Sequence, residues 1–529
     1  MGPTLRATRA LVLLAGFYLL SLVLLAALGA LDWAAFTWTT GSVAAKLFIL
    51  SVVLAIPIVR GMFMLRTPKD DGLTGLPVTD SQEPRLWAAV RDIARQIGTR
   101  APDEIVLDGE VNASVSEDAR FLGLVGGRRR LRLGLPLMAG LSEAQLRSVL
   151  AHEMGHYGNS DTRLSAITAR GRTQVVRTIA HFQERAGRTV AKEQARQEKK
   201  AAKAVAKGKR AKEIDTGGAG LSYRAMAAVY TAYAKFYIRA TLSGARREEL
   251  AADVAAARIA GRDATASALR ELPALDAAHG FYMNAYATLG VEAGMLPPPG
   301  QVFGGVRHLL AARKDELDEM RGSLPSEPAS PYDSHPPIAE RVARIEALPD
   351  DGRASEPVEP SLGLLADAER TLAAVEESVL TPEALRLRRV DWPELVHESM
   401  AAYAEQSAQG FGAVVGEVTG SDGSLTAALD AIDAGALWQI ADRLPKSDEA
   451  HAATGRAARE FARPRLRAGL LQLAGGELVR QGRARWQLSW TDSATLKLPE
   501  GYEETLPAAL DAAVADVPDT EPLRKLLAP

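Results

Sequence analysis

Two histidines and a glutamate lie close together in the segment SVLAHEMGHYGNSDT, residues 148–162. His152 and His156 are four residues apart, a spacing that places both imidazoles on one face of a helix. Glu153 lies one position round the helix, where it could reach a water molecule but is not a natural ligand. The pattern indicates metal-assisted hydrolysis, with two ligands and a general base. The alternative is a helix with two partly buried histidines.

A catalytic zinc needs three protein ligands and an open position for water. Thr162 stands six residues after His156, so the class of site with a third histidine at that spacing is excluded. The segment ARREELAADVAAARIAG, residues 245–261, offers Glu249 and Asp253 four residues apart on one helical face. Two carboxylates on one helical face suggest a third ligand and a partner that orients an imidazole N–H. Alone, this segment would be an amphipathic surface helix with a salt-bridged glutamate.

The flanking sequence predicts the elements that hold these residues. Ser142 offers an N-cap and Gln145 the reciprocal position of a capping box, so a helix should begin at about Glu143. Upstream we expect a linker over 67–78, an amphipathic helix over 84–98, a strand over 104–108 and a β-hairpin that turns at Gly126–Gly127.

Two hydrophobic runs open the chain. Leu11–Ala30 has no charge over twenty residues, and Val43–Leu65 is charged only near its ends. The first is long for a signal peptide and has no polar face, so we expect a retained transmembrane hairpin. A cleaved signal peptide and two buried core helices are the alternatives.

The charges that flank these runs predict their orientation. Arg6 and Arg9 precede the first run, and Arg66 and Lys69 follow the second, whereas the connecting loop Leu31–Ser42 carries a single acid. The positive-inside rule therefore places both ends, and all that follows, in the cytoplasm.

The composition limits the remaining possibilities. The 529 residues include no cysteine, so disulfides and thiolate ligands are excluded, and the net charge of −2 recruits no nucleic acid. The segment 187–216 holds ten basic and four acidic residues. We interpret it as a solvated helix or loop, with attraction to an anionic membrane surface as the alternative. A Pro-rich stretch at 348–360 predicts a domain boundary, and 483–490 beyond it reads as a strand.

Four segments, EVNAS, HEMGH, ELAAD and SHPPIAERVARI, resemble in type and order the motifs of one family. This is the family of membrane-associated zinc metallopeptidases that includes the CAAX prenyl protease and the HtpX heat-shock protease. The resemblance covers roughly Ser81–Leu348 and, loosely, the N-terminal hairpin. It implies one zinc per chain, held by His152, His156 and Glu249, with Asp253 behind them.

The resemblance also implies roles for residues that the spacing alone would not single out. Asn112 takes the place of an asparagine that lines the substrate cleft. His335 becomes a donor of a hydrogen bond to the transition state; without the resemblance it would be a histidine in a Pro-rich turn. The chain departs from known relatives in having the Lys-rich segment where they have further membrane spans. Glu248 is acidic where relatives often carry a basic or aromatic residue.

We therefore expect a mostly α, α+β fold. It comprises a transmembrane hairpin over 1–66, a gluzincin-like peptidase domain with a small sheet over 67–350, and a C-terminal α/β domain over 351–529. The expected activity is hydrolysis of peptide or protein substrates at the cytoplasmic face of the membrane, with Glu153 as general base and a role in membrane-protein quality control. A prenyl-protein protease and a non-catalytic zinc-binding scaffold are the alternatives.

Overall fold

The computed structural model of the chain divides into two compact units. The first comprises Met1–Pro273 and Met320–Ala366, and the second Ala274–Glu319 and Asp367–Pro529. These units do not coincide with the expected domain boundaries at residues 66 and 350, so the division into three domains stays a prediction. The residues described are 3–63, 74–117, 127–157, 162–205, 215–327, 335–353 and 358–528.

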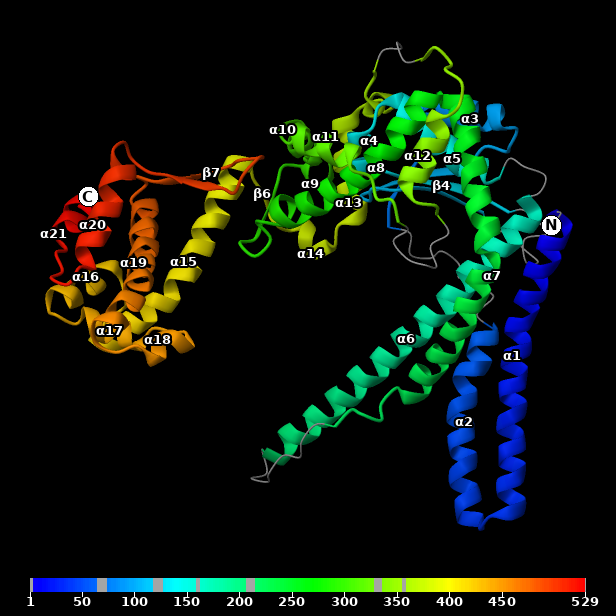
Figure 1. The fold of residues 1–529 in the computed structure, drawn as a ribbon, viewed down its shortest axis with the longest axis horizontal. Helices are drawn as coiled ribbons and strands as arrows, with labels where there is room; N and C mark the ends of the chain where they lie inside the picture. Colours follow the sequence, from blue (N-terminus) through cyan, green and yellow to red (C-terminus); the bar gives the residue numbers. More distant parts are fainter. Residues whose placement is uncertain are drawn as a thin grey trace. The chain divides into compact units, whose positions relative to one another are not determined.

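The N-terminal runs form helices α1 (Pro3–Trp38) and α2 (Gly41–Phe63), which lie side by side as an antiparallel pair (Figure 1). The expected loop over Leu31–Ser42 is therefore wrong for most of its length, because α1 continues to Trp38. Among the described residues, the stretch Tyr18–Trp38 is long and apolar enough to cross a membrane, and Gly41–Ile56 is apolar but shorter. Only 11% of the longer stretch is buried, which argues against a core helix.

A four-stranded sheet forms the centre of the first unit. Its order is β1 (Leu76–Val78), β2 (Glu104–Asp108), β4 (Arg129–Gly134) and β3 (Ala113–Glu117). The pair β2 and β4 is parallel and the outer pairs are antiparallel, so β3 is an edge strand. Alternate side chains of the two central strands enter the core, as the period of a strand requires. They are Ile105, Leu107, Leu131 and Leu133.

The structure confirms the strand over 104–108 and the helix over 84–98, which is α3 (Pro84–Ile97). The linker expected over 67–78 is wrong at its end, because β1 pairs with β2 there; residues 67–73 lie outside the described part. The first strand of the expected hairpin and Gly126 also lie outside it. Among the described residues, the antiparallel partner of β4 is β3.

Helix α4 (Leu135–Gly140) leads from the sheet to α5 (Glu143–Gly155), which packs against α3. The helix begins where the cap predicts. Ser142 Oγ accepts a hydrogen bond from Gln145 N, and Gln145 Oε1 accepts one from Ser142 N, which completes the capping box.

Two long helices follow, α6 (Thr162–Val205) and α7 (Leu221–Ala260), which lie side by side in Figure 1. The Lys-rich segment is helical as far as Val205, and residues 206–214 lie outside the described part. Buried side chains of both helices pack with apolar residues of α1 and α2. Tyr230 of α7 also shares a 2.6 Å hydrogen bond with Ser21 of α1.

The remaining elements of the first unit pack on α7, α4 and α5. Helix α8 (Arg262–Tyr282) begins in this unit, and α12 (Ile338–Glu346) packs on α7 and on the start of α8 through a small apolar cluster. The chain then returns to α4 and α5 through the short helix η4 (Ser361–Leu364). Ser361 donates to the carbonyls of Met138 and Leu141, so this segment belongs with the first unit.

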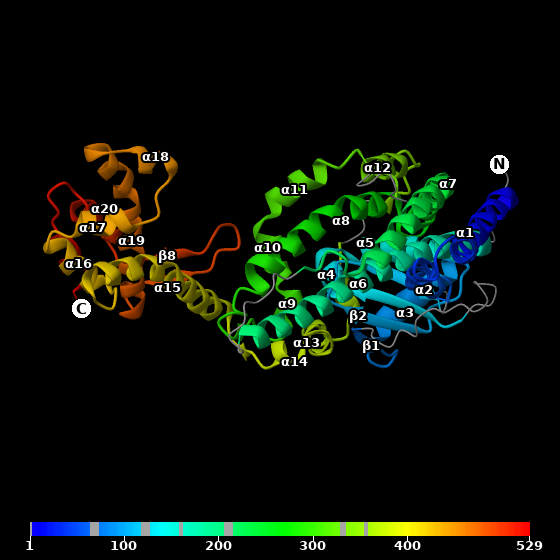
Figure 2. The same cartoon turned by 90° about the horizontal axis from the view of Figure 1, so that it is seen from below.

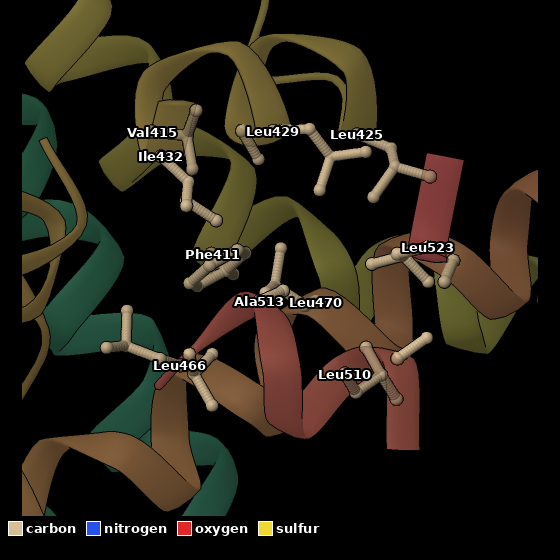
Figure 3. Close-up of a cluster of buried hydrophobic side chains, with 14 of the residues drawn as sticks. Phe411, Val415, Leu425, Leu429, Ile432, Leu466, Leu470, Leu510, Ala513 and Leu523 are labelled. Carbon is tan, nitrogen blue, oxygen red and sulfur yellow. The ribbon is translucent and has the colours of Figure 1, made fainter. Parts of the chain in front are cut away.

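The second unit is mostly helical, with short two-stranded sheets, and the helices of its C-terminal part are seen from below in Figure 2. The segment expected to form a strand over 483–490 contributes only β7 (Arg485–Gln487), paired with β8 (Thr495–Lys497). The core joins α15, α16, α19 and α20, where Phe411, Leu470 and Leu510 converge (Figure 3). The other elements are η2 (Met283–Ala287), β5 (Met295–Leu296), α9 (Gln301–Gly304), α10 (Val306–Ala312), α11 (Lys314–Gly322, which runs on into the first unit), α13 (Ala368–Val379), α14 (Pro382–Leu385), β6 (Arg388–Arg389), α15 (Trp392–Thr419), α16 (Leu425–Asp433), α17 (Leu437–Arg443), α18 (Asp448–Ala452), α19 (Gly455–Arg480), α20 (Tyr502–Ala513) and α21 (Glu521–Leu527).

Candidate metal centre

Helix α5 carries the two histidines to one place. His152 lies in its last turn, and His156 is the C-cap residue, with φ −61° and ψ −15°, so the helical path continues through it. The two imidazole centroids are 4.9 Å apart and the rings are nearly perpendicular. The spacing of four residues therefore brings both rings to one face, as the sequence predicts.

Helix α7 packs along α5 and supplies the third group. Gly155 of α5 faces Ala252 of α7, and these small residues let the two backbones lie close together. Glu249 and Asp253 point from α7 toward the histidines, and both are buried, with 8% and 2% of their surface exposed.

The three expected ligands converge. His152 Nε2 lies 3.4 Å from Glu249 Oε2, and His156 Nε2 lies 3.7 Å from Glu249 Oε1. Each of the three side chains offers one ligand atom, and these atoms lie within 4.8 Å of one another. Two ligand atoms at about 2.1 Å from a tetrahedral ion lie roughly 3.4 Å apart, so the arrangement is close to the size of a zinc site.

The donor set also fits a cation for a second reason. Glu249 Oε2 is buried and makes no hydrogen bond of good geometry within the described part of the chain, and its neighbours His152 Nε2 and His335 Nε2 lie at 3.4 and 3.5 Å. A cation among these groups would compensate a buried carboxylate oxygen that the two rings satisfy only in part. These side chains could therefore hold a metal ion through two nitrogens and one oxygen.

Asp253 lies behind His152. Its Oδ1 is 2.9 Å from His152 Nδ1, on the side of the ring opposite to Nε2. Arg341 of α12 donates two hydrogen bonds to the same carboxylate, at 2.7 and 2.8 Å. A carboxylate in this position fixes the orientation of the imidazole and directs Nε2 toward a metal.

The electrostatics of the metal-free site follow from these contacts. Burial by itself lowers the pKa of His152, but its contacts with Asp253 and Glu249 outweigh burial and raise the pKa to about 9. Burial, together with the charge on His152, lowers the pKa of His156 to about 4. Burial alone would raise the pKa of Glu249, yet its contact with His152 and the nearby His335 hold that pKa below the usual value. A protonated His152 thus lies between the carboxylates of Asp253 and Glu249, and a metal cation bound at Nε2 would displace a proton.

Glu153 is partly buried beside the ligands. Burial raises the pKa of its carboxyl group, although the neighbouring His152 and His335 oppose the rise. A carboxylate beside the ligands could exchange a proton with a water molecule bound there. The role of Glu153 as general base stays a prediction.

His335 also lies at the site, though it comes from a distant segment. Its Nε2 is 3.5 Å from Glu249 Oε2, and 57% of its side chain is exposed. The following residues, Pro336 and Pro337, lead directly into α12. An exposed imidazole over a ligand carboxylate can face an incoming substrate.

Asn112 lies at the start of the edge strand of the sheet. It is exposed, immediately before the edge strand β3, and its backbone carbonyl accepts a hydrogen bond from Gly134 N at 2.8 Å. β3 packs against α5, the helix with the two histidines. Among the described residues, we find no contact that joins the Asn112 side chain to the ligands, so its role stays a prediction.

Two residues of the site were missed from the sequence. Tyr157 donates from its hydroxyl to the carbonyl of Val115 at 2.7 Å and so ties the end of the metal-binding helix to the edge strand. Arg341 is the other. It shares the face of α12 with the apolar residues Ile338, Val342 and Ile345, and an arginine that interrupts such a stripe is a signal for a buried ion pair.

The chain matches peptidase family M48 over residues 80–348, a range that contains Asn112, His152, Glu249 and His335. A protease HtpX homolog of Levilactobacillus brevis is 28% identical to the chain over 157 residues, which make up 29% of this chain and 47% of that protein. The chain thus spans about half the length of this curated relative.

Proposed function

The chain belongs to peptidase family M48, and on that premise we propose that it is a membrane-anchored, zinc-dependent endopeptidase. The family membership confirms the resemblance stated from the four motifs. The observation that carries the proposal is the convergence of His152, His156 and Glu249 from α5 and α7, with Glu153 beside them. Two imidazoles and one carboxylate are a known ligand set of catalytic zinc.

Each ligand has a stated atom in this proposal. Nε2 of His152, Nε2 of His156 and a carboxylate oxygen of Glu249 would hold the zinc, one ion per chain. Asp253 would keep the proton of His152 on Nδ1, so that the lone pair of Nε2 remains free to bind the metal. When bound, zinc supplies a Lewis acid that polarises a peptide carbonyl and acidifies a water molecule.

Glu153 would move the proton. Its carboxylate accepts a proton from the attacking water and returns it to the leaving amine, which the raised pKa favours. His335 lies on the exposed side of the ligands, where its Nε2–H could donate to the oxyanion that forms on the substrate.

The edge strand β3 would hold the substrate. In its pairing with β4, Ala113 and Val115 occupy the non-hydrogen-bonded register positions, so their peptide groups face outward. The carbonyl of Val115 already accepts from the Tyr157 hydroxyl, so a substrate would pair first at Ala113. An extended peptide could pair with this edge, and Asn112 lies at its start.

The membrane part of the proposal rests on the N-terminal helices. The apolar stretch Tyr18–Trp38 and its shorter partner in α2 would form the two-span hairpin in the cell membrane. By the positive-inside rule, the flanking arginines and Lys69 would put the peptidase in the cytoplasm. Substrates that meet such a site are membrane-associated proteins, which favours a role in membrane-protein quality control. We expect no nucleic-acid partner, since the net charge is −2.

Two other functions are distinguished by experiment. A prenyl-protein protease would share every residue of the site and differ in cleaving prenylated peptides. A non-catalytic zinc scaffold would need no general base, so the presence of Glu153 argues against it. A structural zinc also usually fills its fourth position with a protein ligand.

The test uses the full chain, purified in lipid nanodiscs and loaded with zinc. Unfolded membrane proteins and prenylated peptides are offered to the wild type, to Glu153→Gln and to Glu143→Gln. Glu143 lies on the same helix, at its other end, and serves as the matched control.

We expect Glu153→Gln to lose about 10²–10⁴-fold in cleavage rate while zinc content stays at the wild-type level, since the three ligands remain. Glu143→Gln should cleave normally. Undiminished cleavage by Glu153→Gln would exclude Glu153 as the base. A zinc-loaded wild type that cleaves neither substrate class would favour the scaffold.

A further inference from the structure

We propose that Arg341 is a positioning residue for the metal site, which acts through Asp253 on His152 and also fixes the segment that carries His335. This inference rests on the metal site of the proposed function. It concerns a residue that does not touch the metal ligands themselves and that lies 88 positions from Asp253 in the chain.

The first observation is the geometry of the ion pair. Arg341 donates from Nε to Asp253 Oδ2 at 2.8 Å and from an Nη to Oδ1 at 2.7 Å. This two-point contact fixes the plane of the carboxylate, which a single hydrogen bond would leave free to rotate. The same Oδ1 lies 2.9 Å from His152 Nδ1, an atom that makes no hydrogen bond of good geometry within the described part of the chain. The plane of the carboxylate therefore decides whether a lone pair meets the imidazole N–H.

The second observation is burial. Asp253 is 2% exposed and Arg341 is 8% exposed, so water cannot replace the guanidinium if it is removed. A buried carboxylate left with His152 as its polar partner could turn toward any donor within reach. The imidazole would then lose the partner that directs its Nε2.

The third observation is the position of Arg341 on α12. The helix begins three residues after His335, and its apolar side chains Val342 and Ile345 rest on α7 and α8. The ion pair with Asp253 adds a directional bond to that non-directional packing. Arg341 therefore fixes the position of α12 on α7, and with it the segment that holds His335 near Glu249.

The test measures zinc affinity of the purified full chain by competition with a chromophoric chelator. The variants are Arg341→Met, Asp253→Asn, the double variant and Arg341→Lys. Arg344→Met is the matched control, since Arg344 lies one turn farther along the same helix and is exposed. Thermal melting of each metal-free protein is recorded in parallel.

We expect Arg341→Met to weaken zinc binding by about tenfold, in the range seen when a partner behind a metal ligand is removed. Arg344→Met should bind as the wild type does. The double variant should bind no more weakly than Asp253→Asn alone, because Arg341 acts through that carboxylate. Arg341→Lys keeps the charge but loses the fork, so it should bind with an intermediate affinity.

Three results would overturn the inference. The first is that Arg341→Met binds zinc as tightly as Arg344→Met does. The second is that the effects of Arg341→Met and Asp253→Asn on zinc affinity multiply in the double variant. The third is that Arg341→Met lowers the melting temperature but leaves the zinc affinity unchanged. If Arg341→Met does not fold, Arg341→Lys and the double variant, which leaves no unpaired buried charge, decide the question. A wild type that binds zinc but cleaves nothing would refute the proposed function and leave this inference standing.

Discussion

The affinity of the site for zinc should depend on pH in a way that reports the charge on His152. In the metal-free protein the pKa of His152 is raised from 6.5 to about 9. Its proton therefore contributes stability that is fully present below about pH 6.5 and is lost as the pH rises through about 9. A metal ligand must be deprotonated, so each zinc ion bound at pH 7 displaces one proton from this ring.

The number of protons released when zinc binds, and so the pH dependence of the affinity, follows from the neighbouring groups. His156, with a pKa of about 4, is already neutral at pH 7 and adds no slope. Glu249 has a lowered pKa and is ionised throughout this range. One proton is thus released from His152 per ion, so the affinity should rise about tenfold per pH unit well below pH 9 and level off as the pH passes the pKa. The rise between pH 7 and 9 is then about 50-fold, equivalent to about 2.3 kcal/mol.

The assay is competition with a zinc chelator of known proton affinity, at half-unit steps from pH 6.5 to 9.5. Asp253→Asn is the informative variant, because it removes a contact that stabilises the imidazolium; the rise should then end at a lower pH. An affinity that is constant between pH 7 and 9 in the wild type would mean that His152 has an ordinary pKa, and the charge balance described for the site would be wrong.

Further predictions concern the ligand register and the topology. Glu249→Ala should lose most bound zinc and all activity, whereas Glu248→Ala should keep both, as measured by metal analysis and peptide cleavage; the reverse outcome would shift the register of α7 by one residue. Asp253→Ala should be intermediate, about 10–100-fold weaker in affinity or activity. A reporter fused after Lys69 should behave as cytoplasmic in cells, and an external signal would invert the proposed orientation.

Local sequence patterns predicted much of the region around the site. The start of α5 was predictable because Ser142 and Gln145 satisfy the orphan amides of its first turn by a contact three residues apart. The convergence of His152 with His156 follows from the same helical geometry. Strand β2 was predictable because its apolar run is short and bounded by polar residues.

Contacts between distant segments could not be predicted in this way. The ion pair of Arg341 with Asp253 joins two helices whose relative placement no local pattern encodes. The return of residues 358–366 to α4 and α5 depends on backbone hydrogen bonds from Ser361 N to Leu141 O and from Glu143 N to Glu359 O, which almost any sequence could make. The end of α1 was misjudged because the uncharged run ends at Ala30, although the helix continues to Trp38.

The most direct test of the central claim is X-ray absorption at the zinc edge of the purified, zinc-loaded protein, which counts the imidazoles bound to the ion. We predict two imidazoles, from His152 and His156, with the remaining ligands being oxygen atoms at about 2.0–2.2 Å. A count of three imidazoles would mean that His335 is a ligand and not a donor to the substrate. A spectrum without imidazole would contradict the assignment of the site altogether.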